Sequence, residues 1–143
     1  MLLTLLAACG SAPTVAVSEV APELREVFYE LQEGLNAELG YPAITRNSRG
    51  YQLVVDTERA QKTSGNALAA TIYTEGTIAV CHWIPGSGEA KLVLAHELLH
   101  AMGLPHATVG IMRAKVNYAC LDREISCMVE ALDFYTHHQY QEQ

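Results

Sequence analysis

Apolar residues recur at three- and four-residue spacing over residues 19–39, which is the period of an amphipathic helix. Ser18 can cap this segment, Pro22 is compatible with a first turn, and Gly40 can end it. The sequence therefore predicts a scaffold helix over residues 19–39. The apolar positions of this helix are Val20, Leu24, Val27, Phe28, Leu31, Leu35 and Leu39.

Shorter apolar runs follow, and their β-branched and aromatic content is typical of strands. We expect strands over residues 51–55, 68–74 and 77–83. The last two are separated only by Glu75-Gly76, so they should pair as a tight hairpin. The polar stretch 56–66 precedes that hairpin.

Two more helices are expected in the second half of the chain. Residues 89–102 are apolar on almost every side, which predicts a centrally buried helix. Buried polar residues on such a helix need a partner. Residues 121–135 carry apolar side chains on one side and predict a closing helix, and the polar tail from Thr136 is expected to fray.

The polar exceptions on the buried helix form the pattern H-E-x-x-H-x-x-G-x-x-H. Side chains four apart share a helix face, so His96 and His100 can bind one metal ion, with Glu97 near its open position. Gly103 can take the left-handed conformation that ends the helix, and His106 can then reach the same ion. Three protein ligands leave a fourth site for water.

Chance explains this pattern poorly. A bare H-E-x-x-H is expected in roughly one chain of this length in a few hundred, and the longer pattern in about one in a hundred thousand. The alternative is that His96 and His100 are ordinary helix histidines and Glu97 is a surface acid. Two histidines on a buried helix would then need other polar partners.

The pattern resembles the metzincin clan of zinc endopeptidases, and in particular its small, matrixin-like bacterial members. The second mark of the clan is a methionine in a tight turn below the metal, and Met112 in Gly110-Ile111-Met112 matches it. A thioether there would form a soft apolar floor and would not be a ligand. The motifs cover residues 96–112, and the order of elements extends the likeness loosely over 19–135.

The resemblance implies an α+β, metzincin-like zincin fold. Its small twisted mixed sheet would pack on the scaffold helix and on the central metal-binding helix, with the C-terminal helix closing the domain. It also implies that an edge strand above the metal helix binds a protein or peptide substrate in extended form, and residues 68–74 are the match. A plain sheet edge without this role is the alternative.

The implied activity is hydrolysis of peptide bonds by a water that one Zn²⁺ ion activates, with Glu97 as general base. Replacing Glu97 should abolish turnover and spare zinc binding. Some metzincins use a tyrosine just after the Met-turn to stabilise the oxyanion. Tyr118 lies farther along than in that pattern, so it is either such a donor or part of the pocket wall. Residues 113–118 are expected to line the primed-side specificity pocket.

The N-terminus resembles the signal of a bacterial lipoprotein. Residues 1–8 are apolar with small residues before Cys9, which would carry the lipid. Residues 9–18 would be a tether or a short first strand, and residues 19–143 the catalytic domain. The expected location is the cell envelope or the medium, with membrane attachment only through the lipid on Cys9. An ordinary frayed N-terminus is the alternative.

The remaining cysteines are Cys81, Cys120 and Cys127, and an exported protein is expected to pair two of them. On a continuous helix, residues seven apart are separated by about 10 Å, too far for a disulfide. Either Cys120 lies before the helix, or Cys81 pairs with one of the other two. None has the partner motif of a catalytic cysteine.

Composition limits the remaining functions. A chain of 143 residues, half of them hydrophobic, forms one domain, and we expect a monomer. The net charge of −7 and the scattered Lys and Arg exclude nucleic acid as a partner. No dense Asp/Gly loop supports a calcium site. His82 is interpreted as a surface or core residue, and His137-His138 as a tail that picks up metal during purification.

Two alternatives to the endopeptidase remain. A zinc hydrolase of cell-wall peptides would share the metal chemistry but have a different groove. A noncatalytic peptide-binding domain on the same scaffold would keep the histidines without turnover, although the presence of Glu97 argues against it.

Overall fold

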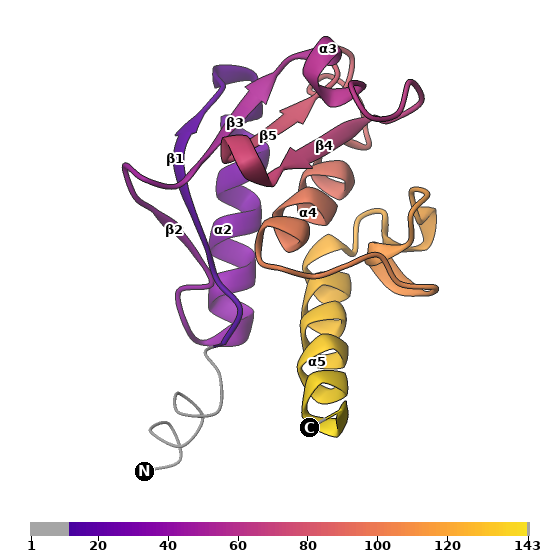
Figure 1. The fold of residues 1–143 in the computed structure, drawn as a ribbon. Helices are drawn as coiled ribbons and strands as arrows, with labels where there is room; N and C mark the ends of the chain where they lie inside the picture. Colours follow the sequence, from indigo (N-terminus) through magenta and orange to yellow (C-terminus); the bar gives the residue numbers. More distant parts are fainter. Residues whose placement is uncertain (1–11, 143) are drawn as a thin grey trace.

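The computed structural model describes residues 12–142, with side chains to residue 138, so the predicted signal 1–8 and the lipid site Cys9 lie outside the described residues. The elements are β1 Val15–Val20, α2 Arg25–Leu39, β2 Ile44–Arg46, β3 Tyr51–Val55, α3 Thr57–Ala60, β4 Ala69–Ile72, β5 Thr77–Val80, α4 Ala90–Ala101 and α5 Glu124–Glu142. The fold is α+β, as predicted, with a mixed sheet, and its long helices α2, α4 and α5 lie together on one side of it (Figure 1).

The strand order is β2-β1-β3-β5-β4, which leaves β4 at one edge of the sheet. Strands β2, β1, β3 and β5 run parallel to one another. The edge strand β4 is antiparallel to β5, which confirms the predicted hairpin. The edge position predicted for residues 68–74 is therefore correct, and β4 also contacts α4.

Helices α2 and α4 pack against each other and against the sheet, and α5 contacts both (Figure 1). The apolar stripe of α2 is buried through Phe28, Leu31 and Leu35. On α4 nearly every apolar side chain is buried, as its sequence predicted. The metal motif is thus carried by the helix nearest the centre of the domain.

The predicted start of the scaffold helix is wrong. Residues 15–20 form β1, and the helix begins only after the short turn Pro22–Leu24. Ser18 does not cap the helix, because its hydroxyl lies on β1 and donates to the carbonyl of Gly50. The strand alternative for residues 9–18 is therefore correct from Val15 on, and a domain boundary at residue 19 would divide β1.

Several shorter elements also differ from prediction. The three-residue β2 and the single turn α3 were missed, since neither is long enough to show a period. Strand β4 ends at Ile72 because the chain turns through Tyr73–Glu75 and a left-handed Gly76. Strand β5 ends at Val80.

The closing helix begins later and ends later than predicted. It spans Glu124–Glu142, so the tail expected to fray is helical. Cys120 lies before it, in the turn Tyr118–Cys120, and forms a disulfide with Cys127 across a Cα separation of 6.0 Å. The first of the two cysteine alternatives is therefore correct, and Cys81 is a buried free thiol.

Gly50 lies against the backbone of β1. A methyl group on Gly50 would stand 2.4 Å from the carbonyl carbon and oxygen of Ala16, and backbone cannot yield as a flexible side chain does. We expect Gly50→Ala to lower the free energy of unfolding by about 2–4 kcal/mol. Urea denaturation measures it, with Gly65→Ala as control because a methyl there meets nothing within 4 Å. Equal midpoints for the two variants would contradict the prediction.

No helix in residues 12–142 is both long enough and apolar enough to cross a membrane.

Candidate metal centre

The helix α4 and the turn after it bring three histidines together. His96 and His100 lie on α4, and Gly103 follows its end with a φ of 106°. The turn returns His106 to the same place, so that one ligand nitrogen from each ring lies within 4.8 Å of the others. The sequence prediction that these residues share one site agrees with this geometry.

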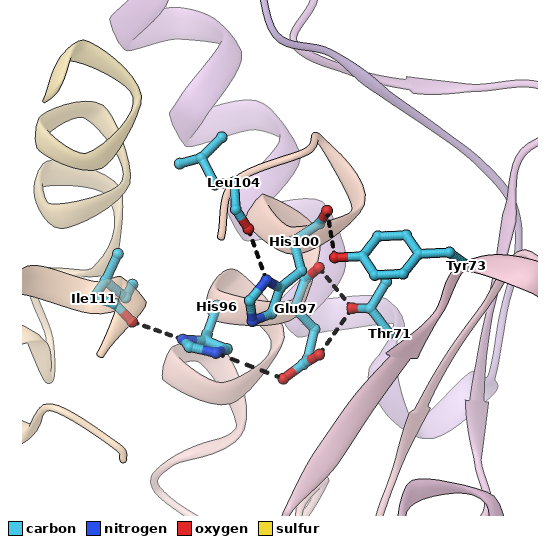
Figure 2. Close-up of polar contacts among 7 residues, drawn as sticks. All are labelled: Thr71, Tyr73, His96, Glu97, His100, Leu104 and Ile111. Carbon is cyan, nitrogen blue, oxygen red and sulfur yellow. Dashed lines mark hydrogen bonds and ion pairs between the residues drawn. The ribbon is translucent and has the colours of Figure 1, made fainter. Parts of the chain in front are cut away.

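Backbone carbonyls fix the orientation of two of these rings (Figure 2). The Nδ1 of His96 donates to the carbonyl of Ile111 at 2.7 Å, and the Nδ1 of His100 to that of Leu104 at 2.8 Å. A carbonyl only accepts hydrogen bonds, so Nδ1 carries the proton and Nε2 keeps its lone pair. The second nitrogen of each ring is therefore ready to bind a metal.

Burial also favours the neutral form of both rings. It lowers the pKa of His96 and of His100 below the usual value, although the carbonyl hydrogen bonds act in the opposite direction. Neutral imidazole is the form that binds metals, and three such nitrogens are the protein ligands of many catalytic zinc sites. The residues present fit a zinc ion.

Glu97 is buried beside the histidines, with 7% of its surface exposed. One carboxylate oxygen lies 3.9 Å from Nε2 of His96, and the other accepts a hydrogen bond of 2.8 Å from the hydroxyl of Thr71. Burial raises the pKa of Glu97 above its usual value, while the Thr71 bond and the charges of nearby histidines oppose the shift. A raised pKa makes this carboxylate a stronger proton acceptor than an exposed glutamate.

Thr71 and Tyr73 are the residues that the sequence did not single out. The Thr71 hydroxyl also lies 3.0 Å from the main-chain carbonyl of Glu97, and the Tyr73 hydroxyl donates to that of His100 at 3.1 Å (Figure 2). Both side chains come from β4 and the turn after it. Their two-residue spacing on a predicted edge strand was the only signal. They attach the edge strand β4 to α4.

The hydrogen bond from Thr71 should hold the Glu97 carboxylate in place. For the peptide hydrolysis that the sequence predicts, we expect Thr71→Val to lower kcat by about tenfold, the value of one hydrogen bond to a charged group, with little change in KM. Steady-state kinetics measure this on zinc-loaded protein. Thr71→Ser keeps the hydroxyl and should restore most of kcat; a serine variant as slow as the valine variant would show that the role of Thr71 is packing.

Met112 lies in the turn Gly110–Met112 and is buried, with 2% exposed. Its carbonyl accepts a hydrogen bond from the amide of Ala107 at 2.8 Å. The same turn supplies the Ile111 carbonyl that orients His96. The turn thus supports the site through its backbone, and the role of the Met112 thioether as a floor stays a prediction.

The three histidines line a cleft with a volume of ≈ 950 Å³. One side is formed by lining residues between 63 and 73, which include β4, and the other by Ile111 and residues 113–118. Residues 113–118 therefore line a pocket, as predicted, whereas their assignment to the primed side stays a prediction. Tyr118 is exposed at this wall, and the charge of Glu89 raises its pKa. Because Tyr118 lines the cleft and interacts with Glu89, we favour its interpretation as part of the pocket wall over that of an oxyanion donor.

The other sequence candidates lie outside the cluster. His82 is exposed, and its Nδ1 is 3.0 Å from the hydroxyl of Thr57, which agrees with its interpretation as a surface residue. His137 and His138 are exposed on α5. Cys81 is buried, and its thiol donates to the carbonyl of Ala67.

Comparison with known proteins adds no relative: no protein-family model, no curated protein and no solved structure matches the chain.

Proposed function

We propose that the protein is a zinc-dependent endopeptidase of the metzincin type. The observation that carries this proposal is the convergence of His96, His100 and His106 beside the buried carboxylate of Glu97, at a cleft bounded by an edge strand. The left-handed Gly103 and the buried Met112 add support, since the resemblance requires both. The closing helix α5 fits the expected order of elements.

When bound, zinc supplies a Lewis acid that polarises the scissile carbonyl and makes water a better nucleophile. The three histidines would hold the ion, two of them in the tautomer that Ile111 and Leu104 impose. Glu97 would take the proton from the attacking water at its carboxylate and deliver it to the leaving amine. Thr71 would keep that carboxylate turned toward the cleft.

The substrate would bind as an extended peptide along β4. The outer side of β4 has no neighbouring strand in the described sheet, so its backbone groups can pair with another chain. Main-chain hydrogen bonds of this kind tolerate many sequences. Side chains that alternate along the bound peptide would then reach the wall formed by residues 113–118.

Export as a lipid-anchored or secreted protein is part of the same proposal. The disulfide between Cys120 and Cys127 supports it, because disulfides persist mainly outside the cytosol. The anchor would be the predicted lipid on Cys9.

The test is cleavage of casein and of peptidoglycan, side by side, by protein with a measured zinc content. The proposal expects one zinc per chain, cleavage of casein, loss of activity on dialysis against a chelator, and recovery when zinc is restored. Cleavage of peptidoglycan alone would support the cell-wall hydrolase instead. Bound zinc without cleavage of either substrate would favour the noncatalytic binding domain.

A further inference from the structure

We propose that the cleft prefers peptides with an acidic side chain next to the scissile bond, and that Arg113 and Lys115 provide this preference. The inference rests on the proposed endopeptidase function and names the substrate class of that site. It is carried by two unpaired cations on the wall of the cleft.

Arg113 and Lys115 are both exposed, and both line the cleft. Three of the other seven basic residues are paired with carboxylates: Arg59 with Glu75, Lys91 with Glu30, and Arg123 with Glu130. Neither Arg113 nor Lys115 has an ion-pair partner among the described residues. Their charges are therefore available to a ligand.

The cleft differs in charge from the protein as a whole. The chain carries a net charge of −7, yet Glu97 is the one carboxylate among the described residues that line the cleft. Glu97 is buried, is hydrogen-bonded to Thr71, and forms no ion pair with Arg113 or Lys115. The lining residues between 63 and 73 are uncharged, so Arg113 and Lys115 supply the cationic charge of the opposite wall, and Glu89 contributes a negative charge beside Tyr118 at its end.

In the sequence, these cations directly follow the turn that contacts the histidine cluster. Arg113 follows the turn Gly110–Met112, whose Ile111 carbonyl orients His96. A substrate residue near the scissile bond that faces this wall would therefore meet Arg113 or Lys115. A glutamate or aspartate there gains a charge pair, whereas a lysine or arginine is repelled.

The experiment compares fluorogenic peptides that differ by Glu or Gln at one position beside the scissile bond, because these side chains have nearly the same shape. We expect kcat/KM to be about three- to fivefold higher for a Glu peptide, which corresponds to one exposed ion pair. Raising the salt concentration should reduce this ratio. In the double variant Arg113→Gln, Lys115→Gln the ratio should fall to about one, while Arg49→Gln, exposed and outside the cleft, should keep it.

A binding measurement separates this inference from the proposed function. Fluorescence anisotropy with uncleaved Glu and Gln peptides on the Glu97→Gln protein should show the same preference as kcat/KM. Equal rates and equal binding for the two peptides would overturn the acidic preference, although cleavage itself would leave the endopeptidase standing. A preference that persists in the double variant would also overturn it. A preference in binding without any cleavage would refute the proposed function alone.

Discussion

Replacing Glu97 with glutamine is expected to lower kcat by roughly 10²- to 10⁴-fold, the usual contribution of a general base. Glutamine has nearly the same shape and can still accept the hydrogen bond of 2.8 Å that Thr71 donates. It cannot take up a proton. Because the three histidines are untouched, zinc content should stay at that of the wild type, and KM should change little.

The measurement is single-substrate kinetics on protein samples of equal zinc content. Glu38→Gln is the matched control, since Glu38 is exposed on α2 and outside the cleft. Two results would contradict the role of Glu97. One is a variant that keeps more than about a tenth of wild-type kcat, and the other is a variant that loses its zinc, which would move Glu97 from catalysis to metal binding.

The second large effect is expected from His100→Ala. The ring of His100 lies 4.6 Å from those of His96 and His106, between centroids, so its loss removes one of three converging ligands. We expect zinc affinity to fall on the order of 10²- to 10³-fold, about a quarter of the binding free energy of a four-ligand site. Proteolytic activity should fall with zinc occupancy.

Competition with a chromophoric chelator measures this affinity directly. Thermal unfolding gives a second readout, because a ligand that binds only the folded state raises Tm with its concentration. The zinc-dependent rise in Tm should disappear in His100→Ala. His137→Ala and His138→Ala, both exposed on α5, should leave one tight zinc in place. If only the tail variants lowered zinc content, the metal centre would be misassigned.

The candidate site was predictable where its residues are neighbours in sequence. His96, Glu97 and His100 lie within one helix, and Gly103 gives the turn that brings back His106. Helical geometry alone relates these positions, so no long-range contact has to be known. The carbonyl partners of the rings were not predictable, because a backbone carbonyl leaves no trace in residue identity.

Thr71 illustrates what sequence could not provide. It is 26 residues from Glu97, and their hydrogen bond depends on β4 lying at the sheet edge against α4. Many strands contain a threonine, so its type and position carried no signal by themselves. Contacts between distant segments become visible only when the topology is known.

The fold was predicted best where one period dominates. Residues 15–20 gave conflicting signals, because Val15 and Val17 alternate as in a strand, whereas Val20 has the helical spacing to Leu24. The segment is a strand because it pairs with β2 and β3, and a register shift between Val17 and Glu19 allows Val20 to be buried as well. The cysteine pairing stayed open for a related reason, since it depended on whether the closing helix starts before or after Cys120.

The loop that forms the basic wall of the cleft is attached to the rest of the domain at both of its ends. At one end the Ile111 carbonyl holds it to His96, and at the other the disulfide between Cys120 and Cys127 fastens it to α5. A reducing environment breaks the disulfide and leaves the hydrogen bond between Ile111 and His96 in place. The position of this wall is therefore linked to the redox state of Cys120 and Cys127, which makes the cleft the part of the domain most directly coupled to the formation of a disulfide.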